Sequence, residues 1–361
     1  MPTFIKTGFW EKVAKGYKGW LNLDDLITSI ASNGPTSLSF PTLQDEIQIF
    51  DNTTMYTFSN NSDIFSTELR FPNLTNVTSS FVVSGGNGYV YSSLVSIPNL
   101  TTVGGDFGIR GGSNTSISTF NLSSLSTVGG SINVEGVNTY PTLNLSALTT
   151  VGGSITIAYG NFIDTDSTID LSSLVTVGGN IGFNANPSIS TFNLNSLTTV
   201  NEINVQAGTS TNPATLNLSS LTTIRELNIN NSGISTINLN SLTTVGYEIN
   251  FYRVNLLTSL DLSSLTTFST GSNGFNISEC SGLTTVNISG LTTIPLTLYI
   301  SFYGCALNVT TVNDILIKIA AISPTGTGAI ELTGGTNAAP TGAGLTAKTT
   351  LQSNGWTVST N

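Results

Sequence analysis

The chain has 361 residues and a net charge of −10, and only 8% of its residues are Asp, Glu, Lys or Arg. In an ordinary soluble domain that share is about 25%. The chain contains no histidine, so the usual general base and the usual imidazole metal ligand are both missing. Nucleic-acid-binding proteins present a basic surface, which the negative charge argues against. We therefore predict a protein that is not an enzyme, holds no cofactor and binds no nucleic acid.

The first 35 residues differ from the rest of the chain in charge. Residues 1–20 have a net charge of +3, which leaves −13 for residues 21–361. Apolar side chains recur at helical spacing over residues 21–32, so a short amphipathic helix is expected there. Large aromatic residues are frequent anchors in buried interfaces. The candidate anchor residues are Phe9, Trp10, Lys12, Tyr17 and Trp20.

We expect residues 1–35 to attach the protein to a partner. The simpler alternative is a solvated basic arm whose aromatic side chains pack on the first structural layer. The opening residues show no apolar stretch of signal-peptide length and no small-residue cleavage pattern. Nowhere does the chain contain the roughly eighteen consecutive apolar residues of a membrane-spanning helix. We therefore expect a protein that is made in a cytoplasm and has no membrane span.

The middle of the chain is a repeat whose consensus reads LNLSSLTTVGGSINI. Ten copies follow one another at spacings of 21 to 26 residues, with clear copies from Phe120, Leu143 and Leu216. A repeat of this length is typical of solenoids, in which a unit buries its apolar face only against its neighbours. The leucine before each threonine pair is expected in the core, at Leu125, Leu148, Leu174, Leu197, Leu221, Leu242 and Leu265.

Each copy contains two short runs of alternating apolar residues, such as Leu143-x-Leu145 and Ile155-x-Ile157. Alternation of this kind is typical of a short strand with one face buried. Gly152-Gly153 supplies a permissive backbone for a corner between the two runs. A copy has no room for a long helix, so we predict a mainly β fold. Residues 36–305 are expected to form a leucine-rich-repeat-like β-solenoid of about ten coils.

Residues 306–361 are expected to form a small α+β cap that covers the last coil and its strand edge. Residues 311–314 resemble a capping box, and apolar side chains at helical spacing follow up to Ile322. A strand is expected at residues 329–333, a second helix at residues 343–354, and a final strand at residues 356–358.

The run L-x-x-V-x-x-x-I-x-I at Leu148, Val151, Ile155 and Ile157, with Asn161 after it, resembles a leucine-rich repeat. The Gly-Gly variety is similar to the divergent repeats of receptor-L-type and bacterial surface proteins, over roughly residues 70–305. The copies depart from that family in their irregular Asn position and in the lack of helices. The resemblance implies a solenoid built from stacked coils.

Both ends of the chain carry a second resemblance. The opening FIKTGFWEKVAKGYKGWLNLDDLI is similar to that of virion and tail-fibre proteins of Bacteroidetes (Flavobacterium-type) bacteriophages. The ending GGTNAAPTGAGLTAKTTLQSNGWTVSTN resembles the tail of repeat proteins from those bacteria and their phages. This resemblance implies a non-enzymatic virion protein: a fibre, a spike or a head or tail decoration.

In a virion protein of this kind, residues 1–35 would bind other virion proteins and the solenoid would contact a host-surface glycan or protein. Several copies, or a homo-oligomer, would be present in the particle. The alternative is a bacterial cell-surface adhesin of leucine-rich-repeat type, which would need an export route. A polysaccharide-degrading solenoid enzyme is a third class.

Four residues carry side chains that could take part in catalysis, cation binding or disulfide formation. Asp164 and Asp166 form an Asp-x-Asp pair, which favours solvated loop carboxylates over a cation site or a glycosidase site. Cys280 and Cys305 are one coil apart, and we interpret them as buried structural thiols. A disulfide would need their Cα atoms within about 7 Å, which the sequence leaves open.

The threonine pairs recur in register with the leucines. They are expected to stack into a solvated ladder of hydroxyl groups on the surface, and an ice-facing or glycan-facing plane is the alternative. The pairs are Thr149-Thr150, Thr198-Thr199, Thr222-Thr223, Thr243-Thr244, Thr266-Thr267 and Thr292-Thr293.

Overall fold

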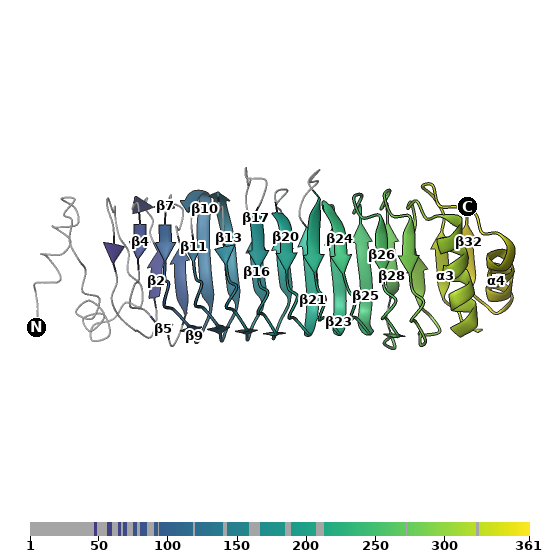
Figure 1. Ribbon diagram of the computed structural model, residues 1–361, viewed down its shortest axis with the longest axis horizontal. Helices are drawn as coiled ribbons and strands as arrows, with labels where there is room; N and C mark the ends of the chain where they lie inside the picture. The colour runs from purple at the N-terminus through teal and green to yellow at the C-terminus, as the bar shows by residue number, and fades with distance from the viewer. Residues whose placement is uncertain are drawn as a thin grey trace, which may run out of the picture. The chain divides into compact units, whose positions relative to one another are not determined.

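The computed structural model describes residues 47–48, 56–59, 64–65, 68–70, 75–77, 80–84, 90–92, 94–117, 120–139, 143–158, 167–184, 189–206, 213–271, 273–322 and 325–361. The chain divides into two compact units, Met1–Gly178 with Asn184–Ser188, and Gly179–Phe183 with Ile189–Asn361. Each unit is a solenoid of parallel strands, and the two contain about nine turns (Figure 1). The predicted mainly β solenoid is confirmed. The helix expected over residues 21–32 lies outside the described residues.

In the first unit the chain alternates between two parallel sheets. One contains β1 (Ile47–Gln48), β4 (Glu68–Arg70), β8 (Leu94–Ser96), β11 (Phe120–Asn121), β14 (Leu143–Asn144) and β17 (Ser167–Asp170). The other contains β2 (Tyr56–Ser59), β3 (Ile64–Phe65), β5 (Asn76–Val77), β6 (Phe81–Ser84), β7 (Val90–Ser92), β9 (Thr102–Val103), β10 (Phe107–Ile117), β12 (Thr127–Val128), β13 (Ile132–Thr139), β15 (Thr150–Val151), β16 (Ile155–Ala158) and β18 (Thr176–Val177).

The second unit has the same plan and ends in two helices. One set of strands contains β20 (Ile189–Asn193), β22 (Ala214–Asn217) and β24 (Ile234–Asn238), and the separate pair β26 (Ser259–Asp261) and β29 (Thr285–Asn287). The other contains β19 (Ile181–Asn184), β21 (Thr199–Gln206), β23 (Thr223–Asn230), β25 (Thr244–Tyr252), β27 (Thr267–Phe268), β28 (Gly274–Ser278), β30 (Tyr299–Ser301), β31 (Ala329–Leu332) and β32 (Thr357–Thr360). The helices are α3 (Val309–Ile322) and α4 (Gly342–Ser353).

Equivalent residues of successive copies lie side by side, because the strands pair in register. In β21 and β23, Ile203 pairs with Leu227, and Leu227 in turn pairs with Ile249 of β25. These side chains are fully buried and alternate with outward polar ones. The leucines before the threonine pairs are also fully buried, each with 0% exposure: Leu125, Leu148, Leu174, Leu197, Leu221, Leu242 and Leu265.

A side-chain contact that recurs in both units shapes the corner at the start of each repeat. The N–H of Leu148 donates to the carbonyl of Leu145 at 2.9 Å, which closes a tight turn. Asn144 precedes that turn, and its Oδ1 accepts the N–H of Ser146 at 3.0 Å. Asn and Asp favour turns through this contact to the backbone two residues on. The equivalent acceptors are Asn121, Asp170, Asn217, Asn238, Asp261 and Asn287.

The glycine pairs let neighbouring coils of the first unit approach closely at the second corner. A Cβ on Gly152 would lie only 2.1 Å from the carbonyl oxygen of Gly129 in the preceding coil. Copies of the second unit have Asn201-Glu202 or Arg225-Glu226 at this place. Their strands run straight through it: β21 and β23 have 8 residues each and β25 has 9. Each of these copies still has two strands, as β20 and β21 show, so the two predicted runs are present and only the predicted corner before the second run is missing.

The C-terminal cap contains the expected strands and helices. β31 pairs with β30 of the last repeat coil, and β32 pairs with β31. The capping box expected at Thr311 is wrong, because α3 begins earlier. The side chain of Asn308 accepts the N–H of Thr311 at 2.9 Å, so Asn308 caps the helix. α4 packs against α3 beside β32 (Figure 1).

Candidate functional site

Several residues selected from the sequence lie outside the part of the chain that the structure describes. They are the suspected anchor residues Phe9, Trp10, Lys12, Tyr17 and Trp20, and the carboxylates Asp164 and Asp166. Their roles remain predictions. The two cysteines are described, and both are free and buried.

The threonine pairs form a ladder, and the structure shows what half of its hydroxyl groups do. Thr222 Oγ1 donates to the carbonyl of Thr198 at 3.1 Å, and Thr243 Oγ1 donates to the carbonyl of Thr222 at 3.1 Å. The same bond recurs from Thr149 to Ser126, from Thr266 to Thr243 and from Thr292 to Thr266. In these five pairs the first threonine thus joins coil to coil. The second threonine of a pair can also be engaged, since Thr176 Oγ1 donates to Thr150 Oγ1 at 3.4 Å.

The outward face of β21, β23, β25 and β28 carries two rows of polar side chains. Glu202 pairs in register with Glu226, and Glu226 with Glu248. Two residues along the strands, Asn204, Asn228, Asn250 and Asn276 form a second row in the same register. Neighbouring strands are about 4.8 Å apart, so the same side-chain group recurs at about that spacing along each row.

Like charges directly opposite one another destabilise a sheet, and amide groups relieve this in the glutamate row. The Nδ2 of Asn228 donates to Glu202 Oε1 at 3.2 Å and to Glu226 Oε2 at 3.4 Å. Arg225 forms an ion pair with Glu226 and stacks on the ring of Tyr247, 5.1 Å from its centroid. Asn180 Nδ2 also donates to Glu202 Oε2 at 3.0 Å, so both oxygens of Glu202 and of Glu226 have protein partners that hold the carboxylates in place.

A strained corner lies at the end of these strands. Arg253 and Glu279 occupy equivalent positions in adjacent coils, with φ of 56° and 53°. Residues other than glycine rarely adopt this left-handed conformation. Their side chains form an ion pair at 2.7 Å, and Arg253 stacks on Tyr252 at 4.8 Å. The hydrogen bond and charge of Glu279 raise the pKa of Arg253 above its usual value.

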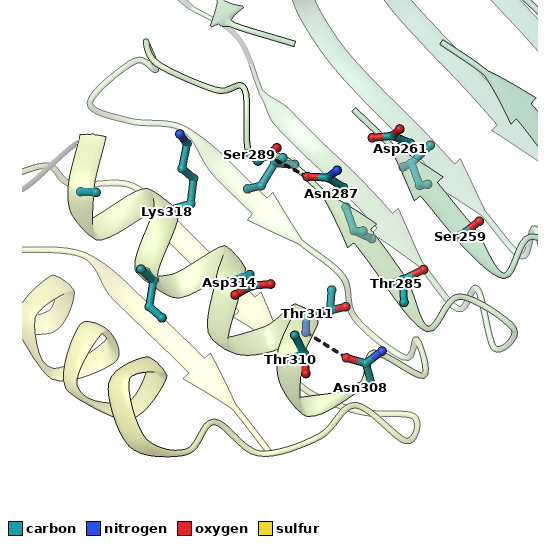
Figure 2. A pocket seen from close by; sticks show the side chains of 15 residues that line it. Ser259, Asp261, Thr285, Asn287, Ser289, Asn308, Thr310, Thr311, Asp314 and Lys318 are labelled. Atoms are coloured by element: carbon teal, nitrogen blue, oxygen red, sulfur yellow. Dashed lines mark hydrogen bonds between the residues drawn. The ribbon is translucent and has the colours of Figure 1, made fainter. Parts of the chain in front are cut away.

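A groove of about 680 Å³ lies between the outward face of β26 and β29 and the side of α3 (Figure 2). Asp261 and Asn287 line its sheet wall, and Asp314 and Lys318 line its helix wall. Ile317 adds an apolar side chain that is 40% exposed. Figure 2 shows the hydrogen bond from the Ser289 N–H to Asn287, which holds the asparagine side chain along the strand.

The groove also contains an open strand edge. Thr285 donates to Thr258 at 3.3 Å and Asn287 accepts from Leu262 at 2.8 Å, so both residues face β26. In a parallel ladder the residue between them points its N–H and C=O to the opposite side. The backbone N–H and C=O of Val286 therefore point away from β26, toward α3. Backbone groups of this kind, beside carboxylates and an ammonium group, are the contacts that an extended peptide uses.

The sequence reasoning missed both polar rows, although a signal was present. The tripeptides Glu202-Ile203-Asn204, Glu226-Leu227-Asn228 and Glu248-Ile249-Asn250 repeat the pattern Glu–apolar–Asn. With the apolar residue inside, alternation places Glu and Asn outside. These tripeptides stand where other copies have Gly-Gly, so they are not part of the consensus sequence of the repeat.

Two general findings hold for the described part of the chain. None of its helices is long and apolar enough to cross a membrane. Within the same residues, no three Cys, Asp or Glu side chains come close enough together to hold a metal ion. Comparison of the chain with protein-family models, with curated proteins and with solved structures finds no match.

Proposed function

We propose that this protein is a non-enzymatic structural protein of a bacteriophage particle, and that its solenoid recognises a polysaccharide on the host surface. Residues 1–35 attach it to other virion proteins, and several copies are present in the particle. The kinship with leucine-rich repeats belongs to the same proposal, and it rests on the sequence motif of the repeat.

One observation carries the recognition part of the proposal: the outward rows of Glu202, Glu226 and Glu248 and of Asn204, Asn250 and Asn276 repeat in register. Carboxylates accept hydrogen bonds, and carboxamides both donate and accept them, so the two rows match the hydroxyl groups of sugars. A polysaccharide is itself periodic and can meet the same groups from coil to coil. Tyr247 and Tyr252 lie beside the rows, and Arg225 and Arg253 stack on their rings.

The proposal predicts that the asparagine row contributes directly to binding. In the double variant Asn250→Ala, Asn276→Ala, two carboxamides are lost from a surface that remains folded. A net hydrogen bond is worth about 0.5–1.5 kcal/mol, so affinity for host-surface polysaccharide should fall roughly tenfold. Biolayer interferometry with polysaccharide purified from the host bacterium measures this change.

The matched control is the double variant Thr215→Ala, Thr236→Ala, which removes two polar side chains from β22 and β24 on the other sheet. It should bind the polysaccharide as the unaltered protein does. Equal affinity of the asparagine variant and the control would contradict recognition by these rows. Soluble sugar released during the assay would instead favour the enzyme class.

A further inference from the structure

Cys280 and Cys305 are the only cysteines in the chain, and they occupy equivalent positions in adjacent coils. β28 pairs with β30 so that Phe275 lies opposite Ile300 and Asn276 opposite Ser301. The same register, continued past the ends of the strands, places Cys280 opposite Cys305. The pairing continues past the strands, because Glu279 N donates to the carbonyl of Tyr303 at 2.8 Å. The two cysteines therefore stack directly on each other.

The two thiol groups have matching surroundings. Cys280 Sγ lies 3.5 Å from the carbonyl oxygen of Ser278, and Cys305 Sγ lies 3.8 Å from that of Tyr303. Each is also close to a carbonyl of the coil before it, Phe251 at 4.0 Å and Ile277 at 3.7 Å. Both side chains thus point in the same direction into the core.

The stacking distance suits a covalent bond. Paired strands are about 4.8 Å apart, and disulfides join residues whose Cα atoms are about 4.4–6.8 Å apart. The thiols already contact each other: a hydrogen bond from Cys305 lowers the pKa of Cys280, and the same contact together with burial raises the pKa of Cys305.

We propose that Cys280 and Cys305 are an oxidisable pair that forms a disulfide between the last repeat coils, next to the cap. Both side chains are almost completely buried, with 0% and 1% exposure, so the oxidant is a small peroxide. One of the two sulfurs, as the thiolate, attacks one peroxide oxygen, the O–O bond breaks, and the second oxygen takes up the proton of that thiol and leaves as water. The sulfur of the other cysteine then attacks the sulfenic acid, the S–O bond breaks, and the hydroxyl group leaves with the proton of that second thiol as a second water. Two thiols and one hydrogen peroxide give one disulfide and two waters.

The bond would reinforce the place where the repeat meets the cap. Ala306 directly follows Cys305, and its N–H donates to the carbonyl of Leu283 at 3.1 Å. The N–H of Asn308, directly before α3, donates to the carbonyl of Thr284 at 3.0 Å. A cross-link here restricts the unfolded chain between the two cysteines. It would therefore hold the cap in place once the protein has left a reducing cytoplasm.

The test treats the reduced, full-length protein with hydrogen peroxide and measures its intact mass. We expect the mass to fall by two hydrogens, a cross-linked peptide containing both cysteines, reversal by dithiothreitol, and a higher midpoint of thermal unfolding. A bulky aromatic disulfide reagent should leave the folded protein unmodified. The variants Cys280→Ser and Cys305→Ser, treated in the same way, should show no loss of two hydrogens.

Three outcomes would overturn the proposal. The unaltered protein could keep its mass, could gain only oxygen atoms, or could form only intermolecular dimers. Circular dichroism before and after treatment verifies that the protein remains folded. Because the decisive measurement uses the unaltered chain, a variant that fails to fold does not affect the result.

Discussion

Individual residues of the repeat have separate tasks, and the polar ones are as specific as the leucines. The leucine before the threonine pair fills the core, as Leu197 does with 0% exposure. The Asn or Asp at the start of the copy fixes a turn, as Asn217 does by accepting the N–H of Ser219. The first threonine bonds to the preceding coil, as Thr222 does to Thr198. A coil therefore depends on its neighbours through backbone, hydroxyl and apolar contacts together.

Leu197→Asp should unfold the coils around it. The carboxylate would enter a dry column of leucines without a partner, and an unpaired buried charge costs several kcal/mol. We expect a large fall in the urea midpoint of unfolding, measured by circular dichroism.

The neighbouring variant Thr199→Asp is the control, because Thr199 is exposed on the same coil. Its unfolding midpoint should stay close to that of the unaltered protein. If both variants unfolded at the same urea concentration, the assignment of inside and outside positions would be wrong.

At the scale of elements, much of the fold could be predicted from the sequence, because equivalent residues recur at regular spacing along the repeat. Leucine columns, the alternation in strands and both cap helices followed from spacing alone. The straight course of β21, β23 and β25 could not be predicted, because the alternation of buried and outward residues is interrupted at the place where Gly-Gly stands elsewhere. Two outward residues separate Val200 from Ile203 in β21. The start of α3 was misplaced because Asn308, a good cap, precedes the motif at Thr311 that resembled one.

The candidate site was less predictable than the fold. The glutamate and asparagine rows exist because three strands pair in register, and register depends on contacts between coils. The groove beside α3 needs the position of the helix relative to β29, which local spacing does not contain. The contact between Cys280 and Cys305 was the exception, since a separation of one coil already suggested that they stack.

The contact between β30 and β31 should make the stability of the folded protein depend on pH. Tyr299 donates to Glu331 Oε2 at 2.7 Å across these strands. Burial and the neighbouring carboxylate raise the pKa of Tyr299, whose ordinary value is about 10. The unfolded chain therefore loses this proton at lower pH than the folded chain does. Stability from this group is complete below about pH 10 and is lost as pH rises through the folded pKa.

Tyr299→Phe should therefore reduce the loss of stability that occurs as the pH rises above about 10. Urea unfolding of both proteins across this range measures the slope of stability against pH. The control is Tyr303→Phe, at an exposed tyrosine of the same coil, which should keep the slope of the unaltered protein. Identical slopes for Tyr299→Phe and the unaltered protein would show that the β30–β31 contact does not titrate.

At the scale of the whole molecule, the chain combines a basic head with an acidic body. Residues 1–20 carry +3 and the remainder −13. Each coil contacts mainly its neighbours, so the two solenoid units can fold without the head. We therefore propose that residues 1–35 attach the protein to the particle and that the polar rows of the second unit recognise the host polysaccharide.

The most direct test of this account is the copy number of the protein in purified phage particles, measured by quantitative mass spectrometry. Buried aromatic residues dominate interface energy, so the double variant Trp10→Ala, Trp20→Ala should be missing from particles while remaining soluble and folded. The unaltered protein should be present in several copies per particle. Absence of the unaltered protein from particles, or incorporation of the double variant at the normal copy number, would contradict the account.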